Sequence, residues 1–66
     1  MTKIERARQL LEEAERRRAV ALDREKWQSE AGWKADAENS RQEADEAAME
    51  CDMYRDIVAV YERAMK

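Results

Sequence analysis

Residues 44–65, ADEAAMECDMYRDIVAVYERAM, decide the fold. Apolar residues recur along this stretch in steps of three and four, which is the pattern of one helix face in a coiled coil. This main stripe consists of Ala44, Ala47, Cys51, Tyr54, Val58, Tyr61 and Met65.

A second apolar stripe runs beside the first on the same predicted helix. Its members are Met49, Met53, Ile57, Val60 and Ala64. Together the two stripes cover a wide arc, so the helix needs more than one partner helix, or one partner helix and a second copy of the chain. Whether the second stripe serves self-association or another protein is left open by the sequence.

The composition is that of a small, highly charged helical chain. Its 66 residues make one domain at most, with no proline, one glycine and 44% charged residues. Alternating β-branched runs and Asn-Gly or Asp-Gly turns are missing. Twelve of the 29 apolar residues are alanine, so the chain can build only a thin core of its own. We therefore expect the chain to gain further stability by self-association.

The N-terminal half predicts a first helix over about residues 3–31. Thr2 and Glu5 have the spacing of a capping box. The apolar stripe that follows is thinner than the C-terminal one and is interrupted by Arg18, within a basic belt of three arginines.

The middle of the chain predicts a reversal over about residues 32–38. Gly32, the only glycine, suits the C-terminal end of a helix. Ser40 and Glu43 form a second capping box, which predicts a second helix over about residues 39–65. The expected fold is therefore all-α: residues 1–66 as an antiparallel hairpin of two long helices, dimerising into a four-helix bundle.

The alternative is one continuous helix in a dimeric coiled coil. A single face runs from Leu22 to Ala44 without a slip in spacing, and a helix of this length would measure roughly 100 Å. An antiparallel pairing in which residue numbers sum to about 69 favours the hairpin, because it places Leu11 opposite Val58. It also brings a half of net charge +2 against a half of net charge −5.

The sequence offers few residues that could catalyse a reaction or bind a metal ion. The chain has no histidine and one cysteine, which rules out an internal disulfide and a Cys/His metal site. Cys51 is flanked by Glu50 and Asp52, whereas a reactive thiol needs a positively charged surrounding. We therefore expect no enzymatic activity, no cofactor and no metal, and we expect Cys51 to be a small core residue.

Two charged groups are candidates for binding a partner. Glu43, Glu46 and Glu50 share a helix face by their spacing and are predicted to form an acidic ridge that meets a basic protein surface. Basic and aromatic residues near the predicted tip are ingredients of nucleic-acid binding. The residues proposed for that alternative are Arg16, Arg17, Lys26 and Trp27.

The leading interpretation is a non-enzymatic protein–protein interaction module, such as an inhibitor, adaptor or regulator, that acts as a homodimer and presents charged helix faces to a protein target. Alternatives are a nucleic-acid-binding dimer and a structural coiled-coil rod. The residues expected to mediate self-association are Leu11, Ala44, Ala47, Cys51, Tyr54, Ile57, Val58, Tyr61 and Met65.

In size and expected shape the chain is similar to small plasmid-encoded helical hairpins that dimerise into four-helix bundles. That similarity is one of architecture alone and carries no residue across. Small, highly charged helical chains also occur among phage and plasmid accessory proteins. No run reaches the ~20 apolar residues of a membrane span, and we expect a cytoplasmic protein.

Overall fold

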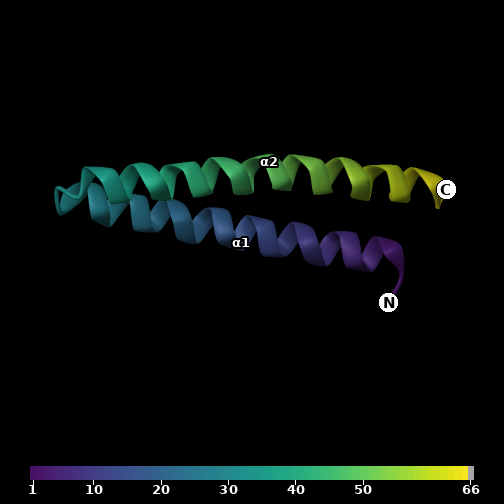
Figure 1. Cartoon of the computed structure of the whole chain (residues 1–66). Helices are drawn as coiled ribbons and strands as arrows, with labels where there is room; N and C mark the ends of the chain where they lie inside the picture. The colour runs from purple at the N-terminus through teal and green to yellow at the C-terminus, as the bar shows by residue number, and fades with distance from the viewer. Residues whose placement is uncertain (66) are drawn as a thin grey trace.

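The chain folds into two long helices that lie side by side and run in opposite directions (Figure 1). The computed structural model describes residues 1–65, in which α1 spans Lys3–Glu30 and α2 spans Lys34–Ala64. Both termini lie at one end of the molecule, the open end, and the turn forms the other end, the tip. The hairpin measures 51 × 17 × 12 Å. The predicted all-α hairpin is confirmed, and the alternative of one continuous helix is wrong.

α1 begins directly after Thr2, which the sequence predicted as part of a capping box. Thr2 is the N-cap in an extended conformation, and its hydroxyl oxygen accepts a hydrogen bond from the Glu5 amide at 3.2 Å. This bond satisfies one of the amide groups that a helix N-terminus leaves without a partner in the helix.

Gly32 ends α1 by adopting a left-handed conformation, with φ of +84°. Its amide donates to the carbonyl of Ser29 at 3.1 Å, and the Trp33 amide donates to the carbonyl of Gln28 at 2.9 Å. These two bonds define a Schellman motif, in which a glycine just past the helix end lets the chain turn back and satisfies the last carbonyls. A side chain at Gly32 would meet no neighbour within 4 Å, so the backbone angle alone selects glycine here.

A second tight turn follows at once and starts α2 earlier than predicted. Trp33 has φ of −86° and ψ of 73°, and the Lys34 amide donates to the carbonyl of Gly32 at 3.1 Å, which is an inverse γ-turn. The reversal therefore takes only residues 31–33, whereas the sequence predicted a turn over 32–38. The second capping box is not used as a cap, because Ser40 lies two turns inside α2.

Ser40 is instead a buried polar residue between the two helices. Its hydroxyl donates to Gln28 Oε1 at 2.6 Å. A serine seven residues into a helix has no terminal amide groups to cap, so its hydroxyl bonds across to the other helix.

Cross-helix contacts establish the register of the hairpin. Five ion pairs link α1 to α2, and the residue numbers of each pair sum to between 66 and 70. The predicted sum of about 69 agrees with this register. The pairs are Arg8–Glu62, Glu15–Arg55, Arg17–Glu50, Arg24–Glu43 and Glu25–Arg41.

The core between the helices consists mainly of small side chains. Within residues 1–65, six of the nine buried apolar residues are alanine, and Ile4 and Val58 are the only large aliphatic ones. Because alanine contributes little apolar area, the contact between α1 and α2 leaves most of the larger apolar side chains half-buried or exposed. The nine residues are Ile4, Ala7, Ala14, Ala21, Ala37, Ala44, Ala47, Cys51 and Val58.

Candidate interaction surface

One broad side of the hairpin carries two hollows, and we call it the groove face. Residues seven apart lie two helical turns apart on nearly the same side of a helix. The edge of α1 on this face therefore runs through Lys3, Leu10, Arg17 and Arg24. The edge of α2 runs through Glu43, Glu50, Ile57 and Ala64. Both hollows are lined by residues of these two edges.

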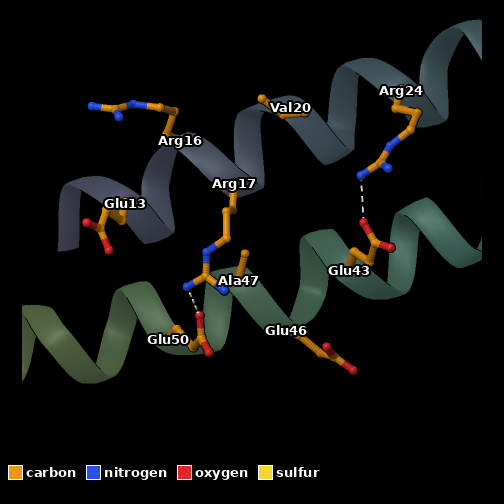
Figure 2. Close-up of a pocket in the computed structure, with 9 residues that line it drawn as sticks. All are labelled: Glu13, Arg16, Arg17, Val20, Arg24, Glu43, Glu46, Ala47 and Glu50. Carbon is orange, nitrogen blue, oxygen red and sulfur yellow. Dashed lines mark hydrogen bonds and ion pairs between the residues drawn. The ribbon is translucent and has the colours of Figure 1, made fainter. Parts of the chain in front are cut away.

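The hollow nearer the tip is ionic. It has a volume of about 590 Å³, and two ion pairs cross it (Figure 2). Arg17 bonds to Glu50, and Arg24 Nη2 lies 2.6 Å from Glu43 Oε2. Because an arginine stands on α1 and a glutamate on α2 in both pairs, the α1 edge is basic here and the α2 edge is acidic.

The hollow at the open end is more apolar. It has a volume of about 580 Å³ and is lined by Leu10 on α1 and by Ile57 and Tyr61 on α2, with the N-terminal residues at its rim. Leu10, Ile57 and Tyr61 are each half-buried. The groove face thus has an apolar half at the open end and an ionic half at the tip.

Further apolar side chains extend the groove face. Met53 lies between Glu50 and Ile57 on the same side of α2, and Val60 lies three residues beyond Ile57. Met53 is 48% exposed and Val60 is 57% exposed. The second apolar stripe therefore keeps exposed side chains that the contact between α1 and α2 does not bury.

The opposite broad face is mostly charged. Its cross-helix pairs are Arg8–Glu62 at 3.2 Å, Glu25–Arg41 at 3.5 Å and Glu15–Arg55 at 3.9 Å. Among the larger apolar residues, Leu22 lies on this side by its spacing from Arg8 and Glu15. The two broad faces therefore differ in character: exposed Met53 and Val60 adjoin the groove face, whereas Leu22 lies on the mostly charged opposite face.

Two of the three carboxylates of the predicted acidic ridge form ion pairs within the chain. Glu43 and Glu50 pair with arginines of α1, whereas Glu46 points away from α1 in Figure 2. The spacing of the three carboxylates on one helix is as the sequence predicted. The sequence feature that could have predicted the two ion pairs is the seven-residue spacing of Arg17 and Arg24, which matches the spacing of Glu43 and Glu50.

The residues predicted for self-association separate into two groups. Ala44, Ala47, Cys51 and Val58 are buried between α1 and α2, so within one chain they pack the hairpin together. The remaining five keep accessible surface. These are Leu11, Tyr54, Ile57, Tyr61 and Met65.

The residues of the nucleic-acid alternative do not share a surface. Arg17 bonds to Glu50, and Arg16 points away from α2 in Figure 2. Lys26 and Trp27 lie more than two turns nearer the tip. The Trp27 ring packs edge-on against Trp33, with the ring centroids 5.5 Å apart. The structure therefore does not bring these four side chains together into one patch.

Within residues 1–65, no group of three or more acidic or cysteine side chains is arranged to hold a metal ion. Over the same residues, neither helix is long and apolar enough to cross a membrane. Comparison with protein-family models, with curated proteins and with solved structures found no match.

Proposed function

We propose that this chain is a non-enzymatic protein–protein interaction module, an adaptor, inhibitor or regulator, that acts as a homodimer. Two copies associate through their groove faces into a four-helix bundle, and the charged opposite faces remain available to a protein target. The observation that carries the proposal is the exposure of Met53 and Val60, beside half-buried Ile57, on one face of the hairpin.

The contact between α1 and α2 buries little apolar surface. Alanines dominate the contact between α1 and α2, and domains of this size rarely gain more than about 3–5 kcal/mol from one core. Covering the groove face with a second copy would remove its large apolar side chains from water, at roughly 25 cal/mol per Å².

The size of the groove face fits this role. The broad side of the hairpin measures 51 × 17 Å, so a second copy would cover roughly 850 Å² on each partner. That area is about the value found per partner in standard stable interfaces.

The alternative of a structural coiled-coil rod is not favoured, because a continuous helix would have supported it and the chain reverses at Gly32. Glu43 and Glu50 lie on the groove face that a second copy would cover, so the prediction that the acidic ridge binds a protein target now rests on Glu46, which points away from α1 in Figure 2. The variant that tests this prediction is Glu46→Lys, because reversing the charge of Glu43 or Glu50 would also break an ion pair within the hairpin.

The experiment that tests self-association compares a variant of the groove face with a matched variant of the opposite face. Met53→Gln with Val60→Gln removes apolar side chains from the groove face. The control, Leu22→Gln, removes an apolar side chain that is 41% exposed and lies on the opposite broad face. Molar mass is measured by light scattering over a dilution series.

We expect a dimer for the unmodified chain, with a dissociation constant raised at least tenfold in the groove-face variant and little changed in the matched variant. Equal weakening by both variants would show that association does not depend on the groove face. A monomer at every concentration would overturn the proposal.

A further inference from the structure

The groove face is asymmetric along its length, and this asymmetry bears on how two copies can meet. Leu10 and Ile57 occupy the half near the open end, whereas Arg17, Arg24 and Glu43 occupy the half near the tip. Two groove faces can be laid together with the tips at the same end or at opposite ends. The two arrangements bring different residues into contact.

With the tips at opposite ends, like residues meet. The midpoint of the hairpin lies close to Arg17 on α1 and Glu50 on α2. A twofold axis across the hairpin there would place α1 over α1 of the second copy. Arg17 would then face its own copy, Glu50 would face its own copy, and Leu10 would lie over Arg24. Such contacts bring like charges together and bury charges against apolar side chains.

With the tips at the same end, unlike charges and like apolar residues meet. A twofold axis along the hairpin places α1 of one copy over α2 of the other at the same height. Leu10 then faces Ile57 of the second copy, and Arg17 faces Glu50. The apolar halves cover each other, and each arginine of the tip half gains a second carboxylate.

Resting on the proposed self-association, we propose that the partner of the groove face is a second copy in parallel orientation, with α1 packed against α2 of the other copy and both tips at one end. Leu10 and Ile57 of the two copies form a four-side-chain apolar layer. Arg17 and Glu50 of the two copies form an alternating ring of four charges.

Distances between spin labels test the orientation. In a Cys51→Ala background, a label at Glu30→Cys marks the exposed tip. Parallel copies place the two tip labels within roughly 20–30 Å, since packed helix axes lie 8–10 Å apart. Antiparallel copies separate them by about the hairpin length of 51 Å. A label at exposed Arg16→Cys, near the midpoint, is the control, because its separation is short in either orientation.

Donor and acceptor dyes on the N-terminal amine of the unmodified chain provide a second readout that needs no change in the core. Parallel copies bring the two N-termini together, so energy transfer is high. Long tip distances and low transfer in a sample that is dimeric by mass would overturn the parallel orientation while leaving self-association in place. A sample without dipolar coupling at either site and with monomer mass would overturn both.

Discussion

Trp33 packs edge-on against Trp27, with an angle of 72° between the ring planes. On one straight helix, two residues six apart would point about 120° away from each other. They meet because the chain reverses at Gly32, which places Trp33 just beyond the Schellman motif. An apolar contact between that position and the last turn of the helix often accompanies the motif.

The tryptophan contact stabilises the turn, and a double-mutant cycle measures by how much. We expect Trp27→Ala and Trp33→Ala each to lower the free energy of unfolding. Their combined effect should fall short of the sum by about 0.5–1.5 kcal/mol, the usual value for an aromatic pair. Chemical denaturation followed by circular dichroism gives the four values. Additive effects would mean that the rings are neighbours without a stabilising contact.

Gly32→Ala tests the turn directly. Because the left-handed conformation costs a residue with a Cβ atom about 1–2 kcal/mol, we expect the free energy of unfolding to fall by that amount. Gly32→Asn should lose less, since asparagine tolerates this conformation better. Denaturation of the three chains at one protein concentration makes the comparison. An unchanged or higher stability for the alanine variant would contradict a left-handed residue at this position.

The Arg17–Glu50 pair is expected to contribute to register more than to stability. Both side chains are partly exposed, and exposed ion pairs contribute about 0.2–1 kcal/mol. Reversing one charge, in Arg17→Glu, should destabilise the chain at low salt. Adding Glu50→Arg should restore most of the loss. A thermal-melting series at two salt concentrations reads both effects, and failure of the double reversal to recover stability would argue against the observed pairing.

Nucleic-acid binding is expected to be absent, because the candidate side chains do not form one surface. A gel shift with structured RNA and with DNA at low salt should show no retardation at micromolar protein. Retardation that disappears when Arg16 and Lys26 are both changed to alanine would revive the alternative.

Much of the fold could be predicted from the sequence. Three- and four-residue spacing located both helices, Thr2 and Gly32 marked the ends of the first, and charge and side-chain size gave the antiparallel register. The start of α2 was predicted five residues late, because Ser40 resembles a cap by its residue type. Only the hydrogen bonds of the turn reveal that three residues are enough to reverse the chain.

The candidate surface was harder to predict. Ala44 and Cys51 were correctly placed on an apolar stripe, but the sequence could not show whether that stripe faces α1 or a second copy. The stripe faces α1 because its side chains are small, and alanine lets two helices of one chain approach closely. The longer side chains of Met53 and Val60 are then left outside the hairpin.

Small-angle X-ray scattering on a sample of measured molar mass tests most directly whether the hairpin pairs with a second copy. We predict twice the chain mass of 7.8 kDa and a longest dimension of about 60 Å, which is the 51 Å between Cα extremes with side chains added. A particle of 7.8 kDa at all concentrations would contradict self-association. A dimer near 100 Å long would contradict the hairpin itself.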